Sequence, residues 1–228
     1  MSLALTGVTP CVTHDAAIGC LPNTIVSSAA MSVSAASDTG PYMTIAITNS
    51  YGAQLSLSFG LDAGYPSPLG DPLPTILPPS FSTQYVYPTG WAGNIGVGPI
   101  LSPKCSKIEG SFTGPPDIDV SYVDGYSVPI TCSSQGKTVT GCNIDLFQQL
   151  ATCEDQIEGP VCLNSAVNIS EGPPPCFFAP CAGAAYTFPH DNHADAGDLG
   201  SNLVSCCIGT SCEAPPWQLQ NNTINCQG

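Results

Sequence analysis

Positively charged residues are almost absent from this chain. The sequence contains no arginine and only three lysines against 17 acidic residues, so its formal net charge is −14. Nucleic acids and anionic membrane surfaces require basic patches, which such a chain does not supply. We therefore expect neither a nucleic acid nor a membrane as a partner, and a neutral polymer or a cation fits this charge better.

Long apolar runs are absent as well. No run approaches the ~18 apolar residues that a membrane-spanning helix needs, and no charged segment followed by an apolar core marks a secretion signal. We interpret the sequence as a mature chain with an added initiator Met. Charged residues make up only 9% of it, so its surface must consist mainly of Ser, Thr, Asn, Gln and Gly, which favours an extracellular protein.

Several functional motifs are also missing. The sequence has no P-loop, dinucleotide-binding fingerprint or nucleophilic elbow, and its cysteines lack the repeated C-x-x-C spacing of zinc sites. Residues 191–198 partly imitate a calcium-binding loop, but the glycine is one place late and the closing glutamate is absent. We predict a solvated polar loop there, and no metal or other cofactor.

Cysteine is abundant instead. Thirteen cysteines predict a disulfide framework formed in an oxidising compartment, and the odd number leaves at least one thiol free or paired between chains. Ten of them lie between Cys132 and Cys226, so this part should be rich in loops that disulfides cross-link. The first half should form a sheet-rich body. Cys206 and Cys207 are adjacent and should each bind a different segment.

Alternating apolar and polar residues predict strands. Residues 43–49 and 54–59 alternate in this way and are interpreted as a hairpin, and residues 82–97 form strands broken at a Pro-Thr-Gly sequence. A long irregular loop is expected over 61–80, which is crowded with Pro and Gly. The best helix candidate is 143–150, where apolar residues follow a helical spacing.

The strongest hairpin signal is Asp124-Gly125, because this pair can adopt the positive φ angles of a two-residue turn. In the run before it, alternation places Asp117 and Asp119 on one face and Val120 on the other. A row of carboxylates on a strand indicates a solvated face, a carbohydrate site or a cation site.

Four strings resemble the thaumatin-like protein family, and specifically its fungal branch. They are IDVSYVDGYSVPI, KIEGSF and PTGWAGNIGVG, together with AAYTFPHDN after Cys181. Cys11 and Cys226 are similar to the cysteines with which the family ties its two ends together. The resemblance covers the chain from about residue 40 onward.

This resemblance implies a mainly β protein, a flattened β-sandwich or barrel with disulfide-rich loop regions and an acidic cleft. In the family the cleft is linked to binding or hydrolysis of β-1,3-glucan, and its carboxylates would here be Glu109, Asp119, Asp124 and Asp191. The chain lacks the arginine of the family's cleft. The motif places Asn94 or Gly98 near that position.

Glycoside hydrolysis requires one protonated and one ionised carboxyl group. We expect Glu109 to be the acid and Asp124 or Asp119 to be the base or nucleophile, with Asp124 also forming a turn. Asp117 is expected to face solvent. Asp191 is expected to bind substrate.

Aromatic residues offer surfaces on which sugars stack. Trp91 and Tyr126 are our candidates for this role, beside Tyr85 and Tyr87, whereas a place in the core is the better interpretation for Tyr122 and Tyr186. Two N-glycosylation sequons, at Asn168 and Asn221, are compatible with secretion.

We therefore predict three parts. Residues 1–40 form an Ala/Ser-rich segment that joins the sheet, 41–131 with the C-terminal end form the β-sandwich body, and 132–215 form a disulfide-rich loop region with a short helix. We expect a secreted protein that acts at a cell wall and binds β-1,3-glucan there. If it is an enzyme, we expect a slow endo-β-1,3-glucanase. The alternative is a non-enzymatic extracellular structural or defence-related protein. Such a protein could also self-assemble through disulfides between chains.

Overall fold

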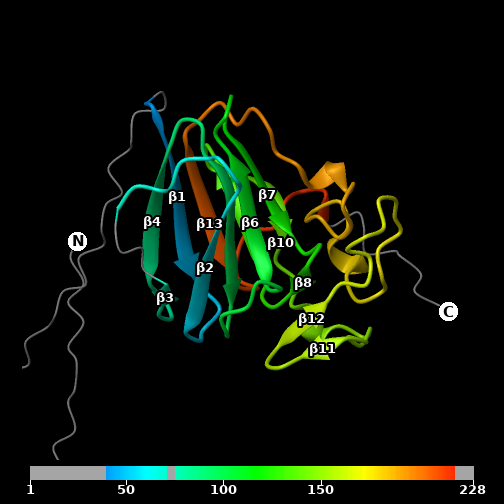
Figure 1. Cartoon of the computed structure of the whole chain (residues 1–228). Coiled ribbons are helices and arrows are strands. Elements are labelled where there is room, and N and C mark those ends of the chain that lie inside the picture. Colours follow the sequence, from blue (N-terminus) through cyan, green and yellow to red (C-terminus); the bar gives the residue numbers. More distant parts are fainter. Residues whose placement is uncertain (1–39, 71–74, 219–228) are drawn as a thin grey trace, which may run out of the picture. The chain divides into compact units, whose positions relative to one another are not determined.

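The fold is known from a computed structural model that describes residues 40–70 and 75–218, all of them within one compact unit. Residues 1–39 of the Ala/Ser-rich segment expected to join the sheet, the pairing of Cys11 with Cys226 and the sequon at Asn221 lie outside these residues. Strands dominate the described chain (Figure 1), so the predicted mainly β fold class is confirmed.

Two five-stranded sheets form the body of the protein. Sheet A has the order β10-β9-β13-β1-β4 and is antiparallel except where β1 pairs with β13. Its strands are β1 (Tyr42–Asn49), β4 (Ser82–Pro88), β9 (Ile130–Ser134), β10 (Lys137–Cys142) and β13 (Leu203–Ile208).

Sheet B is antiparallel throughout and has the order β3-β2-β5-β6-β7. Its strands are β2 (Leu55–Leu61), β3 (Ile76–Leu77), β5 (Ala92–Gly98), β6 (Ser106–Ser111) and β7 (Asp117–Ser121). A small third sheet joins β8 (Gly125–Tyr126), β11 (Gln156–Ile157) and β12 (Val161–Leu163). The part of the chain that the structure describes also contains the 3-10 helices η1 (Leu146–Gln148), η2 (Ala179–Cys181) and η3 (Asn192–Ala194).

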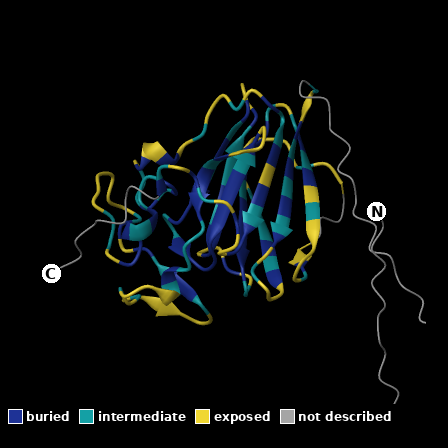
Figure 2. Ribbon diagram, turned by 180° about the vertical axis from the view of Figure 1, so that it is seen from behind, coloured by how far each residue is buried: buried dark blue, intermediate teal, exposed yellow. Residues whose placement is uncertain are grey.

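One core joins sheets A and B. Alternate residues of β1 are fully buried, among them Ile45 and Ile47, and they cluster with Leu57 of β2, Ile95 of β5 and Val120 of β7. Figure 2 shows this alternation as dark-blue and lighter bands along the strands. Because successive side chains of a strand point to opposite faces, the pattern that predicts these strands also selects their buried face.

The strands that contain 43–49 and 54–59 are confirmed, but the hairpin between them is wrong. β1 lies in sheet A and β2 in sheet B, so the chain crosses from one sheet to the other after Asn49. The buried Asn49 side chain donates to the carbonyls of Ala53, Leu77 and Pro78 at 2.8–3.1 Å and accepts from the Tyr51 amide. Backbone carbonyls and amides at this crossing have no partners in a strand ladder, and buried backbone groups need hydrogen bonds. The Asn49 side chain supplies these bonds and so stabilises the passage of the chain from one sheet to the other.

The hairpin expected at Asp124-Gly125 is also wrong. β7 pairs with β6, and Gly125 belongs to β8, which pairs with β12. A Cβ on Gly125 would lie 2.6 Å from the Cys162 carbonyl oxygen and closer still to that of Lys104, so this glycine serves a close approach of backbones. The two-residue hairpin turn is instead Gln135-Gly136 between β9 and β10, where both φ angles are positive, at 51° and 73°.

Four disulfides lie between residues 132 and 212, as predicted for the cysteine-rich half. They are Cys132–Cys206, Cys142–Cys181, Cys153–Cys162 and Cys207–Cys212. Adjacent Cys206 and Cys207 bind different segments, which confirms that prediction. Cys105 is a buried free thiol and Cys176 an exposed one.

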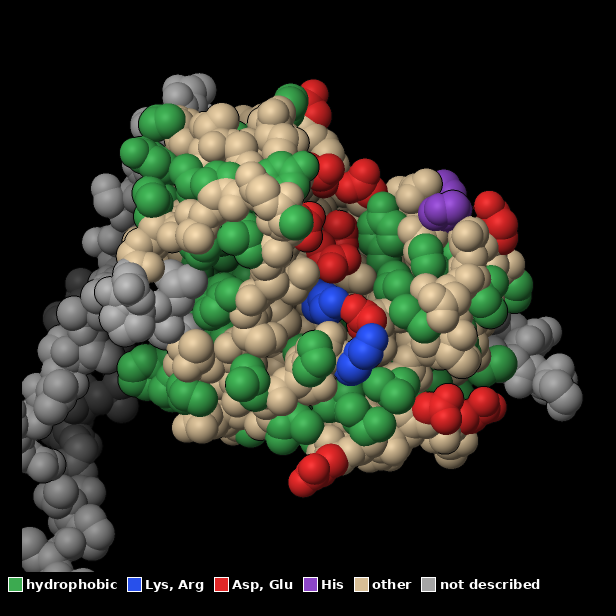
Figure 3. All heavy atoms as spheres, viewed as in Figure 1, with side chains coloured by type: hydrophobic (Ala, Val, Ile, Leu, Met, Phe, Trp, Pro, Cys, Tyr) green, Lys and Arg blue, Asp and Glu red, His purple; other side chains and the backbone are tan. Residues whose placement is uncertain are grey.

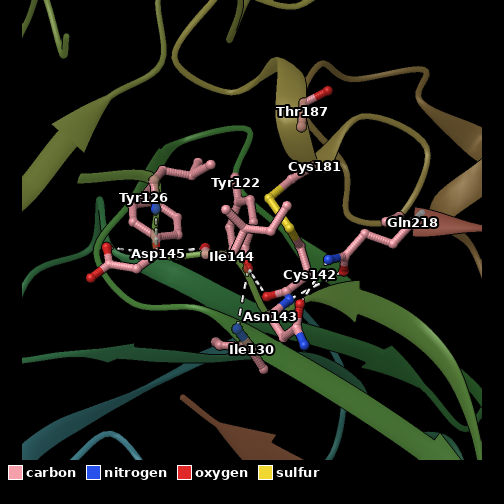
Figure 4. Close-up of a disulfide and its surroundings, with 12 residues drawn as sticks. Tyr122, Tyr126, Ile130, Cys142, Asn143, Ile144, Asp145, Cys181, Thr187 and Gln218 are labelled. Carbon is pink, nitrogen blue, oxygen red and sulfur yellow. Dashed lines mark hydrogen bonds between the residues drawn. A yellow bond between two sulfur atoms is a disulfide. The ribbon is translucent and has the colours of Figure 1, made fainter. Parts of the chain in front are cut away.

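The helix expected over 143–150 is wrong, since only η1 forms there. The Tyr126 hydroxyl donates to the Ile144 carbonyl at 3.1 Å (Figure 4). It accepts from the Leu146 amide at 3.1 Å. Asp145 caps the Phe147 amide at 3.1 Å. These tertiary contacts occupy backbone groups that a longer helix would use, so they outweigh the local periodicity.

Candidate functional site

Carboxylates gather on the face of sheet B that β6 and β7 form. Glu109 and Asp119 are directly opposite each other in the antiparallel ladder, and Asp117 lies two residues before Asp119 on the same face. Figure 3 shows Asp and Glu side chains in a column on this face, above two lysines. The predicted alternation along β7 is confirmed, since Ile118 and Val120 are fully buried on the other side.

Glu109 and Asp119 form the centre of this acidic site. Directly opposed cross-strand residues have Cβ atoms about 4.5–5.5 Å apart, so two ionised carboxylates here would repel each other. The pKa of Asp119 is raised well above its ordinary value. Burial is the largest cause, and the negative charges of Glu109, Asp117 and Asp195 add to it. Asp119 is half-buried as a residue, but its Oδ1 atom is enclosed and has no hydrogen-bond partner among the residues that the structure describes.

Glu109 is affected in the same direction. Burial raises the pKa of Glu109, while Lys107 and a hydrogen bond with Ser121 oppose the rise. Both carboxyls therefore keep their protons to a higher pH than free carboxyls do.

Asp117 was expected to face solvent; it is half-exposed, and its carboxyl also contacts that of Asp195. Burial, together with a hydrogen bond to the Asp195 carboxyl and the charge of Asp195, raises the pKa of Asp117 to about 6. The backbone holds these two residues together, because Ile118 and Ala196 exchange amide-carbonyl hydrogen bonds of 3.3 and 3.2 Å. A hydrogen bond between two carboxyl groups requires that one of them be protonated.

Asp124 has the opposite character. It forms ion pairs with Lys104 at 2.7 Å and with Lys107. Burial alone would raise the pKa of Asp124, but the hydrogen bonds from both lysines outweigh burial and lower it. Asp124 is therefore ionised beside a pair of carboxyls that tend to keep a proton. Its expected role as a positive-φ turn former is wrong.

Asp191 was expected to bind substrate, and its position argues against that role. It is 4% exposed, and its Oδ2 accepts hydrogen bonds from the Thr187 hydroxyl at 2.8 Å, the Thr187 amide at 3.3 Å and the Gly183 amide at 3.1 Å. These bonds fix the loop before η3, so we assign Asp191 a positioning role.

The expected sugar-stacking rings lie in the core, which corrects that prediction. Trp91 is 1% exposed and packs on Tyr87 with ring centroids 3.9 Å apart, and Tyr126 is 0% exposed among Tyr122, Phe147 and Phe177. Neither ring presents a face to a ligand.

Tyr186 was expected in the core, but it is the aromatic residue that lies beside the acidic site. It is half-buried, its backbone pairs with Ser121 and Tyr122 beside β7, and its hydroxyl donates to Asn192 at 3.3 Å. Burial and the charges of Asp195, Asp119, Asp117 and Asp191 raise its pKa, which places it at the edge of the acidic site. Its string, AAYTFPHDN, was the available signal.

Asn94 takes the place opposite Glu109 on β5, whereas Gly98 pairs with Ser56. A Cβ on Gly60 would lie 2.6 Å from the Asn94 amide atoms, so that glycine makes room for the Asn94 side chain. An uncharged amide thus stands beside the acidic pair, and the cations on this face are Lys104 and Lys107.

Within 40–70 and 75–218, no group of three or more His, Cys, Asp or Glu side chains has the arrangement of a metal site. The polar loop at 191–198 is folded around η3. Asn168 is exposed, so a glycan can reach that sequon.

Over the same residues, no helix combines the length and apolarity that crossing a membrane requires. Four disulfides fit an oxidising compartment. No protein-family model matches the chain, and no match appears among curated proteins.

Proposed function

We propose that this is a secreted thaumatin-like protein that binds β-1,3-glucan over its acidic site and hydrolyses it slowly at acidic pH. The observation that supports this most is the opposed pair Glu109 and Asp119, flanked by the ionised Asp124. Retaining glycosidases hold two carboxyls about 5–5.5 Å apart. Opposed cross-strand residues have Cβ atoms about 4.5–5.5 Å apart, so their carboxyls can adopt a separation of this order.

We assign the acid role to Asp119 and the role of ionised partner to Glu109. This reverses the assignment that the sequence favoured, because the pKa of Asp119 is raised well above its ordinary value, and Lys107 and Ser121 counteract the rise at Glu109. The acid protonates the leaving glycosidic oxygen, and the ionised carboxylate attacks the anomeric carbon or activates a water.

A neutral glucan suits this face better than a charged one. The net charge of −14 repels anionic polymers, and sugar hydroxyls can donate to the carboxylates while Asn94 and Tyr186 offer further hydrogen bonds. The half-buried ring of Tyr186 is the aromatic surface at the site.

A non-enzymatic extracellular role is the second candidate. It is favoured because Asp124 and Asp191, two of the four expected cleft carboxylates, are engaged by partners within the protein. In that case the acidic face binds the polymer or another wall component without cleaving it.

Reducing-sugar release from a linear β-1,3-glucan separates these candidates. Wild type, Glu109→Gln and Asp119→Asn are compared at pH 5 together with Glu158→Gln, a matched control at an exposed glutamate. We expect release by wild type and control, and loss of at least about 100-fold in the two site variants. Co-sedimentation with insoluble glucan without release supports the second candidate, and absence of both binding and release overturns the glucan proposal.

A further inference from the structure

The outer face of sheet A, away from the acidic site, carries a recess of about 480 Å³. It lies where the β9–β10 turn meets the start of β13. The residues that line it are Ser133, Gln135, Gly136, Ser201, Leu203 and Ser205. Its volume falls within the ~300–1,000 Å³ of ligand pockets.

The walls of this recess are held rigidly. Ser133 and Ser205 are opposed in the β9–β13 ladder, and the next opposed pair, Cys132 and Cys206, is a disulfide on the buried side of the same strands. The Ser133 hydroxyl donates to the Ser205 carbonyl at 3.0 Å. A preformed site of this kind loses little conformational entropy when a ligand binds.

The turn that forms the rim is fixed as well. Gln135 has a φ of 51°, and its side-chain amide donates to the Gly200 carbonyl at 3.0 Å, which ties the β9–β10 turn to the segment before β13. The Ser205 side chain is exposed and directed to the outer face. The recess thus presents hydroxyl and amide groups beside one apolar side chain, Leu203.

The charge of this region restricts what it can bind. None of the lining residues is charged, and β1, β4, β9 and β13 contain no Asp, Glu, Lys or Arg, although the chain has 17 acidic residues. A cation would find no carboxylate among the lining residues. An anion would meet a strongly negative protein, in which the nearest cation along the chain is a single exposed lysine, Lys137, at the start of β10. An apolar ligand would exclude water from the exposed Ser205 hydroxyl without offering it a hydrogen bond in return. A neutral, polyhydroxylated molecule satisfies all three conditions.

The uncharged surface continues beyond the recess. Ser133 and Ser205 lie in one row with Ala46 and Gln84, and in the neighbouring row the Thr48 and Ser82 hydroxyls are 2.8 Å apart. Neighbouring strands are about 4.8 Å apart, so the row from β9 to β4 offers an uncharged track of about 14 Å.

We propose that this recess is a second saccharide-binding site, which takes one residue of a neutral glycan and lets the chain continue along the row toward β4. It is separate from the acidic site and does not rest on the function proposed for it. Two sites on different sheets would let one molecule hold two polysaccharide chains or remain attached while the acidic face acts.

Amide NMR on the full, ¹⁵N-labelled chain tests this proposal. A β-1,3-linked glucose hexasaccharide is titrated into a protein that carries both Glu109→Gln and Asp119→Asn, so that the recess is followed without the acidic pair. We expect saturable shifts at Gln135, Gly136 and Leu203. Ser205→Glu, added to the same background, should raise the Kd at least tenfold, and Ser165→Glu, at an exposed serine of the loop region, should change it less than twofold.

The outcomes are distinct from those of the glucanase assay. Shifts confined to β6 and β7, an unchanged Kd in the Ser205→Glu protein, or no saturable shift at millimolar sugar would each overturn the second site. Loss of glucan cleavage in the acidic variants with retained shifts at the recess supports both proposals.

Discussion

Replacing Asp117 with Asn should make the protein less sensitive to pH. In the folded protein the pKa of Asp117 rises from 3.8 to about 6. The folded state therefore binds more protons than the unfolded state between these values, and stability falls as pH rises. The contribution of Asp117 to stability is complete below about pH 4 and is lost as pH passes through 6.

The magnitude follows from the size of the shift. About two pKa units correspond to a ceiling of about 3 kcal/mol. Asp117 is half-exposed, and solvent screening reduces this ceiling to about 1–1.5 kcal/mol. Asn keeps the shape of the protonated acid and can donate to Asp195 at every pH, so the variant should not lose this contribution.

Urea unfolding at pH 4.5 and pH 7.5, with disulfides intact, measures the effect. The decrease in free energy of unfolding between these pH values should be smaller in Asp117→Asn than in wild type by about 1 kcal/mol. Glu158→Gln, at an exposed position, is the matched control and should behave as wild type. An equal decrease in wild type and Asp117→Asn would refute a shared proton between Asp117 and Asp195.

Other predictions concern the backbone and the free thiols. Gly125→Ala should lower the free energy of unfolding by about 1–3 kcal/mol, because its Cβ meets two carbonyl oxygens; urea unfolding measures the loss, and a change below 0.5 kcal/mol would contradict it. Gly136→Ala should cost about 1 kcal/mol at its φ of 73°, whereas Gly114→Ala, with open space around it, should be nearly neutral. A thiol reagent followed by peptide mapping should label exposed Cys176 in the native protein and buried Cys105 only after unfolding; fast native labelling of Cys105 would contradict its burial.

The strands and their buried faces could be predicted from the sequence, because a half-buried strand imposes a period of two. Their partners could not. Asn49 looks like a turn residue, yet its buried side chain carries the chain from sheet A to sheet B. Asp124-Gly125 carries a hairpin signature, yet Gly125 is needed because two carbonyls approach it from distant segments.

The acidic site was predicted in part. The register that opposes Glu109 and Asp119 follows from two adjacent strands, and the motif located both residues. The pairing of Asp117 with Asp195 depends on a loop 78 residues further along the chain, which no local pattern reveals. The burial of Trp91 and Tyr126 was missed because an aromatic residue in a strand has the same signature whether its ring packs in the core or binds a sugar.

A titration of the side-chain carboxyls by ¹³C NMR, with and without a β-1,3-linked glucose hexasaccharide, tests the central claim most directly. The account predicts that Asp119 remains protonated well above its ordinary range, that Asp124 is ionised below it, and that the sugar shifts the resonances of Glu109 and Asp119. Ordinary titration of Asp119, together with no response of either resonance to the sugar, would contradict it.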